Sequence, residues 1–147
     1  MVNVADIDVV EPEVSGVEIE NKDMLEVIFW RQKQLMDKYR EIELANLPHV
    51  VPIRVPVDLD SHEGQDQVRQ RIFWTIVELC EASDCMKNKA WKKTMMETDV
   101  PHLKEEMVDA LHFFIEACIL MGVSAEDLFE LYMKKSRVNK FRQRTNY

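Results

Sequence analysis

Glycine and proline are scarce in this chain of 147 residues, which contains three glycines and five prolines. Long stretches are therefore free of the residues that interrupt helices, and this favours an all-α fold. No apolar run approaches the roughly 20 residues that are needed to cross a bilayer, and no basic segment followed by an apolar one opens the sequence. We therefore expect one globular domain without a secretory signal and without a membrane contact.

Cysteine is also rare, with Cys80, Cys85 and Cys118 as the three examples. Their number is odd and none of them forms a Cys-x-x-Cys pair, so neither a disulfide framework nor a thiol-based zinc site is indicated. Reduced thiols in a cytoplasmic location are the simplest interpretation. We expect all three to be core residues.

Basic charge is in short supply, because 19 lysines and arginines face 27 acidic residues and leave a net charge of −8. This balance argues against stable binding of nucleic acid. The charge is uneven: residues 1–22 are acidic and lack a helical period, which predicts a flexible or loosely docked arm. Residues 23–147 are expected to form a single all-α domain with a basic tail. The basic residues of that tail are Lys134, Lys135, Arg137, Lys140, Arg142 and Arg144.

Helical spacing of apolar residues predicts a bundle of about four to five helices. The first is expected at about 23–45, before Pro48, Pro52 and Pro56 exclude a helix. The second is expected at about 65–87. The third begins after a cap at Thr98 or Asp99 and ends at Gly122, and the fourth runs from about 124 to 140. In the second helix the apolar side is expected to comprise Val68, Ile72, Ile76 and Leu79.

Two pairs of acidic residues are the candidate metal ligands of the sequence. Glu78 and Glu81 are three residues apart in the second helix, and Glu106 and Asp109 are three apart in the third. Residues at this spacing share one helix face, so antiparallel packing of the two helices would bring four carboxylates together. Carboxylate oxygens are the ligands that Mg²⁺ prefers. The spacing therefore predicts a magnesium site, with Mn²⁺ as a possible substitute.

The competing interpretation is that these acids coat solvated helix faces. The third helix agrees with this competing interpretation, because its pattern is that of an ordinary amphipathic helix. Its acidic side lies opposite an apolar side that comprises Leu103, Met107, Leu111, Phe114 and Cys118. The second helix differs, because apolar residues surround Glu78 and Glu81. An ionised pair in such surroundings costs several kcal/mol per charge unless a cation compensates it.

The ordered set Glu78-x-x-Glu81 and Glu106-x-x-Asp109 resembles the metal-binding pattern of the all-α nucleoside triphosphate pyrophosphatase superfamily, which includes MazG-type enzymes and dimeric dUTPases. The stretch from Asp109 to Phe114 and the tail Lys135-x-x-x-Asn139-x-x-Arg142 ending in Tyr147 look like the dimeric dUTPase branch. The resemblance implies that the four acids bind magnesium; our hypothesis is that one carboxylate, Glu78 as first choice, positions or deprotonates the attacking water. The resemblance also implies substrate contacts by the following residues: Gln32, Lys89, Trp91, Lys135, Asn139 and Arg142.

Two departures from the branch concern base recognition. Met36 stands where the family commonly has Asn, and Ser136 stands where Asn often follows the tail lysine. Lys92 is expected to accompany Lys89 and Trp91, although a Trp flanked by lysines is as often a loop anchor. His112 is expected to be a structural hydrogen-bonding residue rather than a metal ligand.

The resemblance implies hydrolysis of a deoxynucleoside triphosphate, dUTP first, to the monophosphate and pyrophosphate. The alternatives are a MazG-like enzyme for dCTP or other and modified nucleotides, and a helical interaction module without activity. Ile28, Phe29 and Trp30 are consecutive and point in more than one direction, which indicates a second buried surface. We therefore expect a homodimer.

Overall fold

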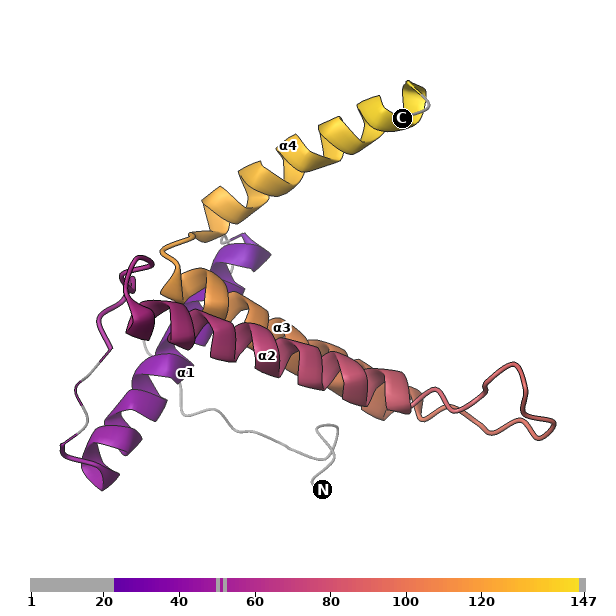
Figure 1. The fold of residues 1–147 in the computed structure, drawn as a ribbon, viewed down its shortest axis with the longest axis horizontal. Helices are drawn as coiled ribbons and strands as arrows, with labels where there is room; N and C mark the ends of the chain where they lie inside the picture. Colours follow the sequence, from indigo (N-terminus) through magenta and orange to yellow (C-terminus); the bar gives the residue numbers. More distant parts are fainter. Residues whose placement is uncertain (1–22, 50, 52, 146–147) are drawn as a thin grey trace.

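The computed structural model describes residues 23–49, 51 and 53–145 (Figure 1). Within them the chain forms helices α1 (Met24–Asn46), α2 (His62–Asp84), α3 (Val100–Leu120) and α4 (Ala125–Arg144), and no strand. The expected all-α class is confirmed. The acidic arm expected at residues 1–22 and the terminal Tyr147 lie outside the described residues.

The N-cap residue of each of the four helices has a side-chain oxygen that can accept a hydrogen bond. Asp23, Ser61, Asp99 and Ser124 each accept a hydrogen bond from a backbone N–H of the first turn, which satisfies a donor that the helix itself cannot. Because Ser61 performs this role, α2 begins three residues earlier than the apolar pattern indicated. Gly122, with φ of 76°, turns the chain after α3 as expected.

Helices α2 and α3 lie side by side and run in opposite directions, and they form the largest contact between elements (Figure 1). Small buried side chains allow this close approach: Ala82 on α2, and Ala110 and Ala117 on α3. Arg71 of α2 donates from Nε to Oε1 of Glu116 on α3 across 2.9 Å. The small residues and this ion pair together fix the register in which the acidic pairs face each other.

Helix α1 crosses α3, and α4 leaves the end of α3 at a bend of 105° to contact α1. A core cluster at this junction contains Phe29, Ile115, Cys118 and Ala125. Burial raises the pKa of the Cys118 thiol, as suits a core residue. The expectation that all three cysteines are core residues was wrong, because Cys80 is exposed and Cys85 half-buried.

The predicted faces of α2 and α3 also require correction. Ile72, Ile76 and Leu79 of α2 were expected on the packed side but are 48%, 53% and 44% exposed. On α3, Met107 and Leu111 are exposed, whereas Glu106 on the supposedly solvated side is buried. The physical reason is that the faces bearing small residues and paired polar groups pack closely. The large apolar side chains are left without a partner in the described part of the chain.

No single described helix is long and apolar enough to cross a membrane. The bent pair of α3 and α4 meets the same criteria of length and composition when the two helices are taken together.

Candidate metal and nucleotide site

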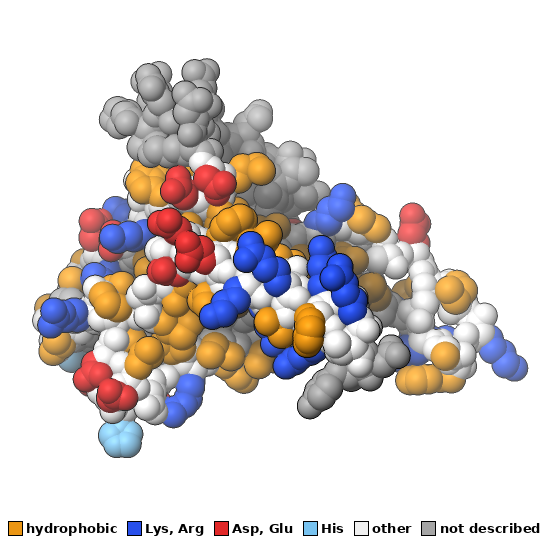
Figure 2. All heavy atoms as spheres, turned by 90° about the horizontal axis from the view of Figure 1, so that it is seen from above, with side chains coloured by type: hydrophobic (Ala, Val, Ile, Leu, Met, Phe, Trp, Pro, Cys, Tyr) orange, Lys and Arg blue, Asp and Glu red, His pale blue; other side chains and the backbone are white. Residues whose placement is uncertain are grey.

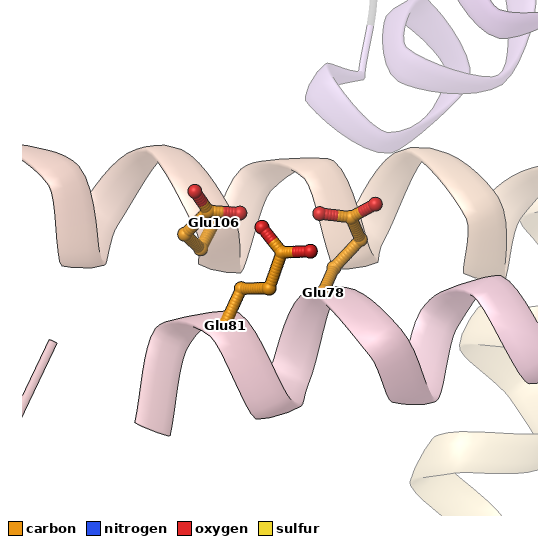
Figure 3. Close-up of side chains that lie close together, drawn as sticks. All are labelled: Glu78, Glu81 and Glu106. Carbon is orange, nitrogen blue, oxygen red and sulfur yellow. The ribbon is translucent and has the colours of Figure 1, made fainter. Parts of the chain in front are cut away.

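Three carboxylates converge between α2 and α3. Glu78, Glu81 and Glu106 each place one oxygen so that all three oxygens lie within 4.8 Å of one another. Figure 3 shows the first two side chains rising from neighbouring turns of α2 toward α3, where Glu106 meets them. Three hard oxygen donors at this spacing match the ligands that a divalent cation such as Mg²⁺ takes. The predicted meeting of the two acidic pairs is therefore present for three of the four residues.

Asp109 lies beside this group rather than within it. It is half-buried on α3, one turn beyond Glu106, and its charge acts on Glu78. Burial is the largest cause that raises the pKa of Glu78, followed by a side-chain hydrogen bond with Glu106 and the negative charges of Glu81, Glu106 and Asp109. The carboxylates of the cluster thus repel one another, and a bound cation would reduce this repulsion.

His102 is a partner of the cluster that the sequence analysis missed. Its Nε2 hydrogen-bonds Oε1 of Glu106, whose residue is only 6% exposed. This contact fixes the orientation of the most deeply buried carboxylate in the cluster. The signal was available, because His102 precedes Glu106 by four residues and therefore shares its helix face.

A cavity of about 660 Å³ adjoins the cluster at the connection between α2 and α3. Glu81 and His102 line its inner side, and Lys87, Lys89 and Lys92 contribute positive charge. Lys89 and Lys92 thus line the same cavity as Glu81, and the substrate contact expected of Lys89 stays a prediction. Trp91 does not line this cavity: it is 79% exposed and its ring lies 5.6 Å from Nζ of Lys89.

Gln32 is held on the other side of the cluster, where α1 crosses α3. The residue is 4% exposed, and its Oε1 accepts a hydrogen bond of 2.6 Å from Nδ1 of His112. This contact agrees with the structural role expected for His112. With its carbonyl oxygen engaged, Gln32 has its amide N–H₂ available as a donor.

The basic tail lies apart from the carboxylates. Lys135, Asn139 and Arg142 are exposed on α4, which packs on α1 rather than on α2. Figure 2 looks down onto α4 and shows Lys and Arg side chains gathered in the middle of that face. Within the described chain, the tail and the acidic cluster are therefore two separate charged regions.

Comparison with known proteins assigns the central segment. The model of a dUTPase family matches residues 56–121, which contain α2, α3 and the connection between them. A dCTP pyrophosphatase from Enterobacteria phage LZ5 is 36% identical over 70 residues, covering 40% of this chain and 41% of that protein. The chain thus spans less than half the length of this relative. No solved structure matches.

The matched segment holds all four acidic residues and Lys89, but neither Gln32 of α1 nor the basic tail of α4. The resemblance is confirmed where the metal-binding pattern lies, and the substrate contacts expected from Gln32, Lys135, Asn139 and Arg142 stay predictions. Through its two acid-bearing helices, the central segment of this chain is similar to the all-α nucleoside triphosphate pyrophosphatase superfamily.

Proposed function

We propose that this protein hydrolyses a pyrimidine deoxynucleoside triphosphate to the monophosphate and pyrophosphate in a magnesium-dependent reaction. The observation that carries the proposal is the convergence of Glu78, Glu81 and Glu106 beside a lysine-lined cavity. The family match and the phage relative support it: one is described as dUTPase, and the other acts on dCTP by its name.

The donor set suits the cation that this activity implies. Glu78, Glu81 and Glu106 would hold Mg²⁺, with Asp109 positioned to join them. Bound there, Mg²⁺ would offset the charge of the triphosphate and lower the pKa of a coordinated water. Mn²⁺ takes similar oxygen ligands and is the expected substitute.

Residues of the protein would supply proton transfer and phosphate binding in this reaction. Glu78, whose pKa is raised by its surroundings, would accept a proton from the attacking water. The oxygen of that water bonds to phosphorus as the bond from phosphorus to the leaving phosphate oxygen breaks. Attack at the α or the β phosphorus gives the same two products. Lys89 and Lys92 would hold the leaving pyrophosphate by charge.

We further propose that the chain works as a homodimer. Large apolar side chains are exposed along α2 and α3, including Ile72, Ile76, Met107 and Leu111. An isologous contact between two copies would cover them. A phosphate contact by Lys135, Asn139 and Arg142 requires either such a second copy or movement of α4, because within one chain the tail packs on α1.

The proposal is tested by measuring pyrophosphate release from each canonical and several modified deoxynucleoside triphosphates, with and without Mg²⁺. We expect release from dCTP or dUTP that requires the cation. Release confined to modified or purine nucleotides would favour the MazG-like alternative. A chain that releases no pyrophosphate from any of them would favour the interaction module.

A further inference from the structure

A second cavity lies on the same face as the acidic cluster, where α1, α2 and α3 meet. Its volume is about 330 Å³, and its lining includes Met36, Arg71, Trp74, Phe113 and Glu116. At 100° per residue, Arg71 and Trp74 lie within about 40° of Glu78 around α2, and Phe113 and Glu116 lie equally close to Asp109 around α3. The cavity therefore lies on the same faces of α2 and α3 as the carboxylates, displaced from them along the two helices.

Stacked aromatic rings form one wall of this cavity. Trp74 and Phe113 have ring centroids 6.1 Å apart and an interplanar angle of 26°. Each ring is four residues from an acid of the cluster, Trp74 from Glu78 and Phe113 from Asp109. One helical turn thus separates this wall from the carboxylates. A planar heterocycle is the kind of ligand that an aromatic wall of this sort accepts.

An ion pair supplies the polar groups of the cavity. Arg71 and Glu116 pair through Nε and Oε1 at 2.9 Å, and their side chains are 21% and 12% exposed. Nη1 of Arg71 also donates to Oε1 of Gln70 at 2.5 Å and of Gln67 at 3.3 Å. Among the described residues, Nη2 of Arg71 and Oε2 of Glu116 form no hydrogen bond. A donor and an acceptor therefore remain side by side in the cavity.

The separation between the ion pair and the cluster suits a nucleoside. Arg71 is seven residues from Glu78, and Glu116 is seven from Asp109, which is roughly 10 Å along each helix. A base at the ion pair, with one edge of its ring system against the neighbouring aromatic rings, would direct its sugar and phosphates toward the carboxylates. The phosphate chain would then continue toward Lys89 and Lys92 in the opposite cavity.

We propose that the Arg71–Glu116 pair reads the base and selects cytosine over uracil, an inference that rests on the proposed function. Cytosine presents an N4 amino donor next to acceptors at N3 and O2. Oε2 of Glu116 accepts from the amino group while Nη2 of Arg71 donates to N3. Uracil places a carbonyl oxygen against the carboxylate and an N–H against the guanidinium, so both contacts become repulsive. Met36 adds no polar group that would favour uracil.

The first test compares kcat/KM for dCTP and dUTP in the full-length protein with Mg²⁺. The wild type is expected to favour dCTP by roughly ten-fold or more, as suits a site built to hydrogen-bond its substrate. In Glu116→Gln, an amide can face either base, so the dCTP to dUTP ratio should fall about ten-fold, mainly through KM. Asp66→Asn on α2, which breaks an exposed ion pair with Arg69, is the matched control and should leave the ratio unchanged.

A binding measurement separates this inference from the proposed function. Non-hydrolysable α,β-imido analogues of dCTP and dUTP are each added to the wild type, and the rise in melting temperature is recorded. A larger rise with the dCTP analogue supports the assignment even if turnover is slow. A larger rise with the dUTP analogue, or equal rises with both analogues, overturns the assignment of Arg71 and Glu116 to cytosine. Neither result contradicts the proposed hydrolysis. Failure of both analogues to bind overturns the inference and the proposed function together. The wild-type comparison decides the matter even if Glu116→Gln does not fold.

Discussion

Glu78 is surrounded by three other carboxylates, and this environment makes its proton equilibrium sensitive to what binds nearby. Burial is the largest of the causes that raise its pKa above the ordinary 4.5. Because the folded-state pKa exceeds that of the unfolded chain, folding favours the protonated form. Without a cation, this contribution to stability is full below about pH 4.5 and is lost as pH rises through the folded-state pKa.

Replacing Glu78 by Gln therefore has two opposite expected effects. Turnover should fall by at least about 10²-fold, because the group that accepts the proton from water is gone. The metal-free protein at pH 7 should melt at a higher temperature, because a neutral amide is not repelled by the charges of Glu81, Glu106 and Asp109. Assays of pyrophosphate release and melting curves without divalent metal measure the two effects.

The matched control is Glu130→Gln, which removes an exposed carboxylate on α4 and should change neither quantity. Wild-type turnover in Glu78→Gln would contradict the catalytic assignment. A lower melting temperature without metal would contradict the electrostatic argument.

Gly64 is a second residue whose role follows from geometry. A Cβ at this position would lie 2.0 Å from the carbonyl oxygen of Asp58 and 3.0 Å from Oγ of Ser61. Gly64→Ala must therefore displace the backbone that caps α2. We expect a loss of about 2 kcal/mol or more in the free energy of unfolding.

Denaturant unfolding measures this loss. Ser83→Ala, at an exposed position on α2, is the matched control. It should change stability by less than about 0.5 kcal/mol. Equal stability of Gly64→Ala and wild type would show that the turn adjusts without cost.

At the scale of elements, the sequence predicted which helices exist but not which faces pack. Caps at Asp99 and Ser124 and the turn at Gly122 are local signals, and these boundaries agree with the structure. Packing faces depend on partners far along the chain. The Arg71–Glu116 pair joins residues 45 positions apart, and no local pattern indicates it.

The acidic cluster, like the helix caps, could be predicted because it depends on local signals in the sequence. Each pair of acids is set by spacing within one helix, and only the antiparallel packing of α2 on α3 had to be assumed. The basic tail could not be placed in this way, because the 105° bend between α3 and α4 depends on the contact of α4 with α1.

The exposed faces of α2 and α3 lead to a prediction about assembly. If a second copy covers Ile76, sedimentation should show a species of twice the 17.4 kDa chain mass. Ile76→Glu should convert it to the single-chain mass at micromolar concentration, because a charge is then buried in an apolar contact. Glu63→Gln, at the exposed start of α2, should leave the assembly unchanged. A wild type that sediments only as a single chain would exclude the dimer.

Across the whole molecule, three proposed functions follow one another along α2, α3 and the connection between them: base recognition at Arg71 and Glu116, the cation at the carboxylates, and phosphate contacts at Lys89 and Lys92. Helices α2 and α3 contribute to all three places, and the family match covers both helices. This order along the two helices is the order of the parts in a deoxynucleoside triphosphate. This correspondence links the electrostatics of the cluster to the proposed reaction.

The central claim is that divalent cations compensate the gathered carboxylates. It is tested most directly by the melting temperature of the purified protein as Mg²⁺ is added, with Na⁺ at equal ionic strength as the reference. Binding to the native state alone should raise the melting temperature progressively, by an amount equivalent to about 2.7 kcal/mol at one hundred times the dissociation constant. This rise should be absent in Glu78→Gln. A wild-type melting temperature that does not respond to Mg²⁺ or Mn²⁺ would contradict the account.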